Sequence, residues 1–450
     1  MMIRTILFSL LLLAGLRAAD RPNILFIMID DMGWMDLRVQ GNLAVETPNI
    51  DRFAGEGMRF TDAYAASPVC SPTRAAIMTG LAPARLHLTN HTPDQKRFTP
   101  DNPKLLPAPM HQHLKADYRT LAEELKAAGY TTAFMGKWHL SGREDDQGTR
   151  EPQAQGFEIN IGGCNFGGPP TFFDPYEIPH LKPRKKGEYL PERLADEAIA
   201  YMKKDHGGKP FLLCLWNYTV HWPMEAPENL LKKYADHKGK GLNDPRYGAM
   251  IEGMDLAIGR VLKALDDLEL RDDTLVVFTS DNGGYGGVAD NRPLRADKGH
   301  LYEGGIRIPL IVRWPGVIEA GKTCAVPVIS TDWFPTLLEV GGAKAPELTD
   351  GESLMPVLRG DGKLERDALF FHYPNYAFHR SNRLGGAIRV GKHKLIERFD
   401  DGSLELFDLE ADLGEKRNLA AQKPDLAEGL ARRLRDWRES VGANMPTKPE

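Results

Sequence analysis

The chain has 450 residues, 42% of them hydrophobic, and a formal net charge of −5 at neutral pH. This length is enough to bury a large core and to form two or three domains. The net negative charge and the lack of a basic block in the sequence argue against a nucleic-acid partner.

The first 19 residues have the pattern of a secretory signal peptide. Arg4 lies in a short charged start, and Ile6–Leu16 follows as an apolar run that is too short to span a bilayer. We therefore expect export, to the periplasm or out of the cell. Because Leu16-Arg17-Ala18 lacks the small-x-small pattern of a cleavage site, a retained anchor stays an alternative. No later segment is long and apolar enough to cross a membrane.

The sequence contains four cysteines, which is few for an exported protein of this size. They are Cys70, Cys164, Cys214 and Cys324. We therefore expect the hydrophobic core, rather than disulfide bonds, to supply most of the stability.

The first predicted strand delivers two carboxylates. Asn23–Ile29 is a continuous apolar run, typical of a buried parallel strand, and Asp30 and Asp31 follow it directly. A solvated turn after the strand is the alternative interpretation. The next element, at Thr47–Gly57, is predicted as a helix that Pro48 opens.

The stretch Ser67–Gly80 places a lone cysteine at the entrance of a short helix. Ser71 is predicted to cap this helix and Pro72 to occupy its first position. Cys70 then faces free backbone N–H groups, which favour negative charge, and Arg74 lies one turn further on. This arrangement suits a nucleophile that acts on an anion. The alternative is a buried cysteine before an ordinary amphipathic helix.

Helical and strand-like patterns then alternate, which predicts βαβ units and a large, mostly parallel sheet sandwiched by helices. The pattern comprises a helix at Thr120–Ala128, strands at Tyr130–Met135 and Phe211–Asn217, and a periodic helix at Tyr247–Leu268. Lys137 and His139 follow the first of these strands, and His221 follows the second.

A second buried strand, Thr274–Thr279, ends in Ser280 and the oxygen ligands Asp281 and Asn282. The carboxyl ends of parallel strands meet at one edge of a sheet, where ligands bind. Three carboxylates and an amide gathered there would repel one another without a hard cation, and oxygen ligands suit Ca²⁺ or Mg²⁺.

Lys298 follows the same strand, and Pro309–Trp314 returns as another strand. Singly, such residues are more often surface lysines or satisfied core histidines. Together, Lys137, His139, His221 and Lys298 would supply cations and proton donors at the edge where an anion should bind.

The composition changes after Gly341, so we place a domain boundary between residues 20–345 and 346–450. The second part contains strand-like pieces at Ala368–Tyr373, Ala387–Val390, His393–Arg398 and Leu404–Asp408, and an amphipathic helix at Pro424–Val441. Tight turns between these pieces predict a small antiparallel sheet with a packed helix.

The spacing Cys-x-Pro-x-Arg at Cys70 resembles the signature of the type I sulfatases, in the alkaline phosphatase superfamily. Gly-Lys-Trp-His-Leu around Lys137, His221 before Trp-Pro, and Lys-Gly-x-x-x-Glu-Gly-Gly from Lys298 also resemble that family. The resemblance runs from Pro22 to about Pro315 without a departure at a catalytic position. It implies an alkaline-phosphatase-like fold with a smaller C-terminal subdomain.

The resemblance also implies a chemistry. A formylglycine-generating enzyme would oxidise Cys70 to formylglycine (3-oxoalanine), whose hydrate attacks sulfur. One Ca²⁺ would be held by Asp30, Asp31, Asp281, Asn282 and residue 70. The catalytic residues would be Cys70, Arg74, Lys137, His139, His221 and Lys298. In this hypothesis Arg74 polarises the nucleophile, His221 and Lys298 hold the sulfate and donate to the leaving alcohol, and His139 is the base that releases sulfate.

We expect a sulfated sugar or polysaccharide as the substrate, read by loops over the sheet edge. The candidate loops are Leu88–Arg97, Gly162–Pro170 and His372–Arg383, and the candidate contacts are Asn90, His91, His379, Arg380 and Arg383. Segments around Cys164 and Ala84–Thr92 resemble galactose or N-acetylgalactosamine sulfatases. The alternatives are a phosphonate or phosphodiester hydrolase of the same superfamily, and a non-catalytic protein that binds sulfated glycans.

Overall fold

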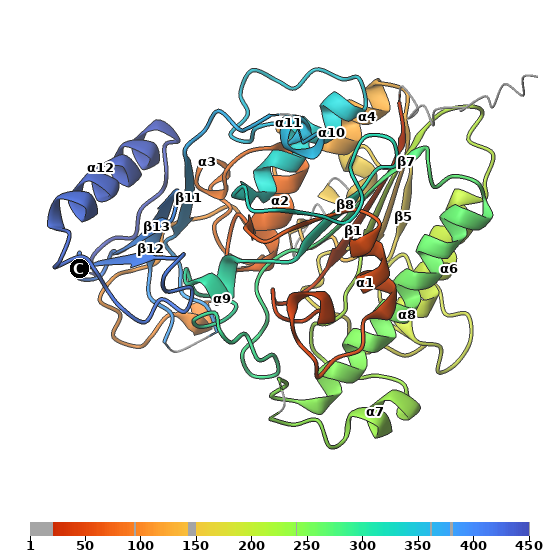
Figure 1. Cartoon of the computed structure of the whole chain (residues 1–450), viewed down its shortest axis with the longest axis horizontal. Helices are drawn as coiled ribbons and strands as arrows, with labels where there is room; N and C mark the ends of the chain where they lie inside the picture. Colours follow the sequence, from red (N-terminus) through yellow and green to blue (C-terminus); the bar gives the residue numbers. More distant parts are fainter. Residues whose placement is uncertain are drawn as a thin grey trace, which may run out of the picture.

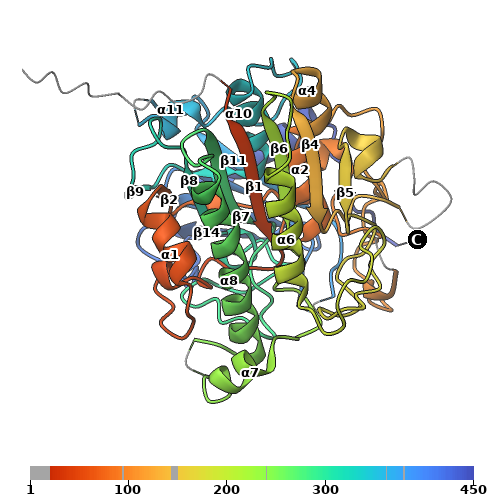
Figure 2. The same ribbon diagram turned by 90° about the vertical axis from the view of Figure 1, so that its right-hand side faces the viewer.

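The computed structural model describes residues 21–93, 96–142, 150–239, 241–360, 362–378 and 381–449. The predicted signal peptide at residues 1–19 lies outside these ranges. The centre of the molecule is an eight-stranded sheet with the order β5-β4-β6-β1-β7-β8-β2-β9 (Figures 1 and 2). Its strands are β1 (Asn23–Ile29), β2 (Met58–Phe60), β4 (Thr131–Gly136), β5 (Ile159–Ile161), β6 (Phe211–Trp216), β7 (Thr274–Ser280), β8 (Leu310–Arg313) and β9 (Lys322–Cys324).

Most neighbouring strands of this sheet are parallel. β1 pairs in parallel with β6 and β7, β4 with β5 and β6, and β2 with β9. Only β8 runs against its neighbours, β7 and β2. The predicted α/β class with a large, mostly parallel sheet is therefore confirmed.

Helices cover both faces of the sheet. Because successive side chains of a strand point to opposite faces, Leu25 and Ile27 join one core cluster, while Ile24 and Phe26 join the other. Figure 2 shows α1, α6 and α8 in front of the sheet, with α2, α4 and α10 behind it. These helices are α1 (Pro48–Gly55), α2 (Cys70–Thr79), α4 (Leu121–Ala127), α6 (Leu190–Met202), α8 (Pro245–Asp267) and α10 (Trp333–Val340).

Shorter elements complete this part of the chain. β3 (Ala63–Tyr64) and β10 (Val328–Ile329) form a two-stranded parallel sheet. The short helices are α3 (Pro83–Leu86), α7 (Glu228–Tyr234), α9 (Glu303–Ile306) and α11 (Met355–Leu358).

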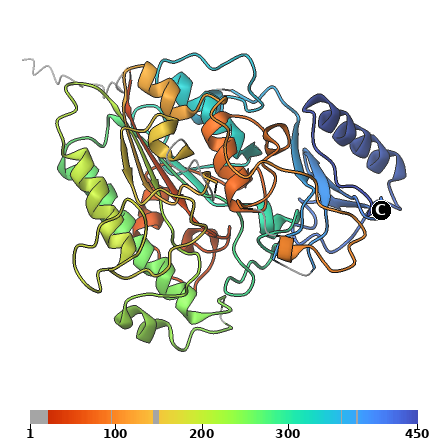
Figure 3. The same ribbon diagram turned by 180° about the vertical axis from the view of Figure 1, so that it is seen from behind.

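The C-terminal region forms a separate antiparallel sheet, as the sequence predicts. Its strands are β11 (Ala368–Tyr373), β12 (Gly385–Val390), β13 (His393–Arg398) and β14 (Leu404–Asp408), in that order. One face packs on the main body through Phe371 and Ile396. The other face carries Ile388 and Leu395, and α12 (Pro424–Ser440) covers it (Figure 3).

Two further expectations concern membranes and disulfides. Among the described residues, no helix has the length and hydropathy needed to cross a membrane. All four cysteines are free thiols: Cys70, Cys164 and Cys214 are buried, and Cys324 is partly exposed.

Candidate functional site

The carboxyl ends of β1 and β7 bring the predicted oxygen ligands together. The two strands are parallel neighbours with Ile29 opposite Ser280, so Asp30 and Asp281 leave the sheet side by side. Asp31 turns back with a φ of 61°, and its backbone N–H donates to Asp281 Oδ1 at 3.2 Å. Both strand ends are fully buried, so their charges must be compensated within the protein.

Helix α2 places Cys70 and Arg74 against these carboxylates. The helix begins at Cys70, two positions earlier than predicted, and Val69 is its N-cap. The predicted cap by Ser71 is therefore wrong, and its hydroxyl lies 3.2 Å from the Thr92 hydroxyl instead. Arg74 donates from Nε and Nη2 to Asp281 Oδ2 at 2.9 and 2.6 Å. This paired geometry fixes the carboxylate orientation.

Two lysines neutralise the other two carboxylates. Lys137 Nζ donates to both oxygens of Asp30 at 2.8 and 2.7 Å, and Lys298 Nζ lies 2.5 Å from Asp31 Oδ1. Burial alone would raise the pKa of Asp31, but the charge of Lys298 holds it well below its usual value. The three carboxylates are thus balanced by three cationic side chains, those of Arg74, Lys137 and Lys298. An added divalent cation would give the site a net positive charge.

A glycine makes the position of Lys137 possible. Gly136 ends β4 with a φ of 103°, and a Cβ there would lie 2.0 Å from the Trp216 carbonyl oxygen of the neighbouring strand β6. No side chain fits at this point. Glycine lets the chain leave the sheet here, and the Lys137 carbonyl then accepts a hydrogen bond from Arg74 Nη1.

The hydrogen bonds of His139 and His221 determine which nitrogen of each ring carries the lone pair. His139 Nε2 lies 2.6 Å from the Thr92 carbonyl oxygen, which can only accept, so Nδ1 carries the lone pair. That Nδ1 is buried and has no hydrogen-bond partner among the described residues. His221 Nδ1 lies 3.0 Å from the Trp222 carbonyl oxygen, and its Nε2 lies 3.7 Å from Asp31 Oδ2. Burial lowers the pKa of His221 to about 3, against the opposing charge of Asp31.

The cluster has the donor set of a hard-cation site. Oxygen atoms of Asp30, Asp31 and Asp281 and the sulfur of Cys70 all lie within 4.8 Å of one another. Asn282 Nδ2 donates to Asp31 Oδ1 at 2.9 Å, which leaves Asn282 Oδ1 buried without a partner among the described residues. An oriented, unpaired carbonyl oxygen beside three carboxylates fits Ca²⁺ or Mg²⁺.

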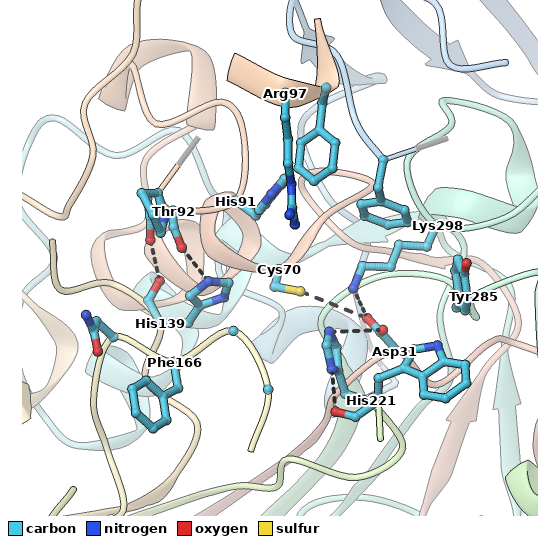
Figure 4. A pocket seen from close by; sticks show the side chains of 17 residues that line it. Asp31, Cys70, His91, Thr92, Arg97, His139, Phe166, His221, Tyr285 and Lys298 are labelled. Carbon is cyan, nitrogen blue, oxygen red and sulfur yellow. Dashed lines mark hydrogen bonds and ion pairs between the residues drawn. The ribbon is translucent and has the colours of Figure 1, made fainter. Parts of the chain in front are cut away.

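A cavity of about 600 Å³ opens over Cys70 (Figure 4). Its lining comprises Asp31, Cys70, His91, Thr92, Pro93, Arg97, Phe98, His139, Asn165, Phe166, Gly167, Gly168, His221, Trp222, Tyr285, Lys298 and Phe378. Asp30, Arg74, Lys137, Asp281 and Asn282 lie behind this lining and are fully buried.

Only some of the described residues that the sequence predicts as substrate contacts line the cavity. His91 lines the cavity. Asn90 lies behind it, with its Nδ2 donating to the Tyr376 carbonyl at 2.9 Å. Arg383 is outside the cavity lining, and its guanidinium contacts Asp400 and Asp401 at 2.5 and 2.7 Å.

Two other predicted substrate contacts, His379 and Arg380, lie outside the described residues.

Sequence reasoning missed three aromatic side chains that line the cavity. Phe98, Trp222 and Tyr285 line the cavity, yet none of them belongs to a predicted substrate loop. Trp222 and Tyr285 each follow a predicted site residue by one to three positions. Proximity to His221 and Asn282 is the signal that could have found them.

Comparisons with known proteins agree with this geometry. The family model for sulfatases matches residues 22–343, and the model for the N-sulphoglucosamine sulphohydrolase C-terminal region matches residues 295–440. Arylsulfatase A of Bos taurus is 34% identical over 475 residues, which cover 93% of this chain and 87% of the relative. N-acetylgalactosamine-6-sulfatase of Mus musculus is 34% identical over 416 residues, covering 85% and 73%.

The fold of a solved sugar complex is also similar. The crystal structure of Ps i-CgsB in complex with k-i-k-neocarrahexaose aligns with a TM-score of 0.80 and 28% identity, covering 93% of each chain. Sequence and structure comparisons thus agree over nearly the whole described chain, including the strand ends that carry the site. The chain belongs to the sulfatase family of the alkaline phosphatase superfamily, and it is a sulfatase.

Proposed function

We propose that the protein removes sulfate from a sulfated carbohydrate, with formylglycine formed from Cys70 as the nucleophile and one Ca²⁺ as the metal. One observation carries this proposal: Cys70 opens a helix within 4.8 Å of three buried carboxylates, under a cavity that also exposes Lys298 and His221. The unmodified thiol is a poor nucleophile there, because burial raises its pKa to about 12.

Asp30, Asp31, Asp281 and Asn282 would hold the metal, which would supply Lewis-acid stabilisation of the sulfate oxygens. Formylglycine, as its hydrate, would supply one hydroxyl to attack sulfur and a second whose deprotonation allows sulfate to leave. Formation of the modified residue requires a formylglycine-generating enzyme as a partner.

The chain's own residues would bind the anion and move protons. Lys298 keeps its proton, because Asp31 raises its pKa against the effect of burial. It can therefore hold a sulfate oxygen and donate to the leaving alcohol. The unpartnered Nδ1 of His139 can accept a proton. His221 donates from Nε2 only when its ring is protonated, since Nδ1 already faces a carbonyl oxygen.

The size and lining of the cavity favour a sugar over a bare anion. About 600 Å³ is within the usual range for small-molecule sites and far exceeds one sulfate group. The names of two similar proteins, an N-acetylgalactosamine-6-sulfatase and a protein in complex with k-i-k-neocarrahexaose, support a carbohydrate sulfate, with N-acetylgalactosamine or galactose sulfate as first candidates. Export after removal of residues 1–19 belongs to the same proposal.

Mass spectrometry of the peptide containing Cys70, after expression with a maturating enzyme, tests the nucleophile. We expect the sulfur to be replaced by an aldehyde oxygen, and turnover of 4-nitrophenyl sulfate to rise with the converted fraction. Hydrolysis of an aryl phosphodiester serves as the comparison. Faster cleavage of the phosphodiester would favour the phosphonate or phosphodiester hydrolase alternative, and a free thiol without turnover would favour the glycan-binding alternative.

Calcium binding is expected to depend on Asn282. Replacing Asn282 by alanine removes the unpaired Oδ1 while all three carboxylates stay, so we expect Ca²⁺ affinity to fall by about tenfold or more. Calorimetric titration of Ca²⁺ into EDTA-treated protein measures this affinity. The control is Asn375→Ala, which removes an equally buried amide that bonds Thr89 and the Ala108 carbonyl. Equal Ca²⁺ affinity in the two variants would exclude Asn282 as a ligand.

A further inference from the structure

A second cationic group lines the cavity, apart from the residues that would bind the scissile sulfate. Arg97 extends into the cavity from above, on the side opposite Asp31 (Figure 4). Arg74, Lys137 and Lys298 each contact a buried carboxylate. Arg97, in contrast, makes no ion pair with any residue that the structure describes, and its side chain is exposed to the cavity and solvent.

Among the described residues, no carboxylate forms an ion pair with Arg97. Of the described residues that line the cavity, Asp31 alone carries a carboxylate, and Lys298 at 2.5 Å and the Asn282 amide at 2.9 Å already contact its Oδ1. His91, beside Arg97, is neutral at pH 7, because burial lowers its pKa to about 3. A guanidinium exposed to a cleft attracts an oxyanion.

Aromatic rings connect Arg97 to the sulfate site. The Lys298 ammonium lies 5.5 Å from the centre of the Phe378 ring, which lies 6.2 Å from the Phe98 ring. The Arg97 guanidinium lies 5.1 Å from the centre of the Phe98 ring. A guanidinium stacked on a ring keeps its in-plane N–H groups for a carboxylate or sulfate.

The aromatic rings between Arg97 and Lys298 form a wall that suits the apolar face of a sugar. Tyr285 extends it, with its ring centre 5.8 Å from that of Phe378. The C–H groups on one side of a pyranose ring can pack on such rings, while the hydroxyl groups point away from them. A sugar lying on this wall with its scissile sulfate near Lys298 would direct its far side toward Arg97.

From this arrangement we propose that the cavity holds a second anion subsite, in which Arg97 binds another sulfate or a carboxylate of the same substrate. The preferred substrate is then a sugar with two anionic groups, one of them the sulfate to be removed. This inference rests on the proposed function, because it assumes that the first group is bound over Cys70. Arg97 acts as a specificity-determining residue and takes no part in bond cleavage.

The test compares three probes in the turnover-blocked Cys70→Ala background. They are N-acetylgalactosamine 6-sulfate, N-acetylgalactosamine 4,6-disulfate, and a disaccharide of N-acetylgalactosamine 6-sulfate with a uronic acid. We expect at least one dianionic probe to bind about fivefold to tenfold more tightly than the monosulfate, and Arg97→Gln to reduce this advantage to less than about twofold. Added salt should weaken the advantage as well.

A matched variant controls for the loss of an arginine. Arg246 lies 5.7 Å from the Trp222 ring but pairs with Asp244 at 2.6 Å and does not line the cavity, so Arg246→Gln should keep the preference for the dianion. The identity of the preferred dianion distinguishes a sulfate from a carboxylate partner. Equal binding of all three probes by the parent protein would overturn the proposal, as would an equal loss for every probe in Arg97→Gln.

Kinetics of the unsubstituted enzyme separate this proposal from the proposed function. Hydrolysis of the monosulfate and the dianions with the same kcat/KM would overturn the subsite and leave the sulfatase mechanism standing. Turnover that persists in the Cys70→Ala protein would instead overturn the nucleophile, whatever the binding preference.

Discussion

Replacing Cys70 by alanine is expected to reduce kcat/KM for 4-nitrophenyl sulfate by at least about 10³-fold, with little change in fold. Activity is lost because alanine cannot be converted to a nucleophile. The surrounding cationic side chains stay in place. The structural cost should be small. Cys70 Sγ has one weak polar contact, 3.9 Å from Asp31 Oδ1, and the side chain is small, so we expect about 1 kcal/mol of lost stability.

The matched control is Cys214→Ala. Cys214 is as fully buried as Cys70, but it lies within β6 among apolar side chains, away from the cavity lining. We expect this variant to keep wild-type turnover and to melt at about the same temperature as Cys70→Ala. Thermal unfolding and steady-state kinetics on the two proteins provide the comparison. Turnover by Cys70→Ala within tenfold of the wild-type rate would contradict the assignment of the nucleophile.

The sequence could predict the elements whose signal is local. The run Asn23–Ile29 is apolar after its first residue and is bounded by Pro22 and Asp30, and β1 has these same ends. Parallel pairing of β1 and β7 then follows from two such runs, and it brings Asp30 and Asp281 together. The predicted residues at the strand ends therefore meet because sheet topology allows little else.

Other features depend on contacts that a local pattern does not contain. The Arg383 side chain pairs with Asp400 and Asp401 because the β12–β13 hairpin places the following turn beside it. The register in which β12 pairs with β13 therefore determines whether Arg383 reaches these two carboxylates. The aromatic wall likewise combines Phe98, Tyr285 and Phe378 from three distant segments. The antiparallel direction of β8 is a further such feature, because the long connection from β7 to β8 is compatible with either direction.

Replacing Lys394 by methionine is expected to destabilise the protein by about 3–5 kcal/mol. The Lys394 ammonium is fully buried between two acidic side chains, 2.9 Å from Glu303 Oε1 and 2.9 Å from Glu415 Oε1. Methionine preserves much of the side-chain volume but removes the cation that the two carboxylates share. Glu303 keeps Arg307 at 3.1 Å, whereas Glu415 loses its ion-pair partner among the described residues. Lys392→Met is the control, because Lys392 is exposed, pairs only with Asp408 and should change the melting temperature by no more than about a degree.

The loss of folding stability in Lys394→Met should depend on pH. The direction of this dependence follows from the pKa values of the two carboxylates. In the wild type, Lys394, Arg307 and Arg389 together outweigh burial and lower the pKa of Glu303 to about 2, whereas burial raises the pKa of Glu415 to about 7. Without the ammonium the folded-state pKa of Glu415 rises further above its unfolded value, while Arg307 still stabilises the charge of Glu303. The folded variant then keeps the Glu415 proton to a higher pH than the folded wild type does, so its stability continues to fall with rising pH above about 7, where the wild-type loss levels off. Thermal unfolding between pH 5 and 8 measures this, and an unchanged pH profile would contradict the buried-charge argument.

The same variant should also reduce turnover, because this ion network holds the segment that carries Lys298. The Glu303 backbone N–H donates to Glu415 Oε2 at 2.7 Å, and Asn382 Nδ2 donates to the Gly299 carbonyl at 2.9 Å. Loops of the C-terminal region thus fix both ends of the turn after Lys298. We expect kcat to fall by about tenfold or more in folded Lys394→Met, since small displacements of a catalytic cation are costly. Adding Glu415→Gln removes the charge that Lys394 no longer balances and should restore stability more than turnover. Full recovery of turnover would show that the network is structural alone.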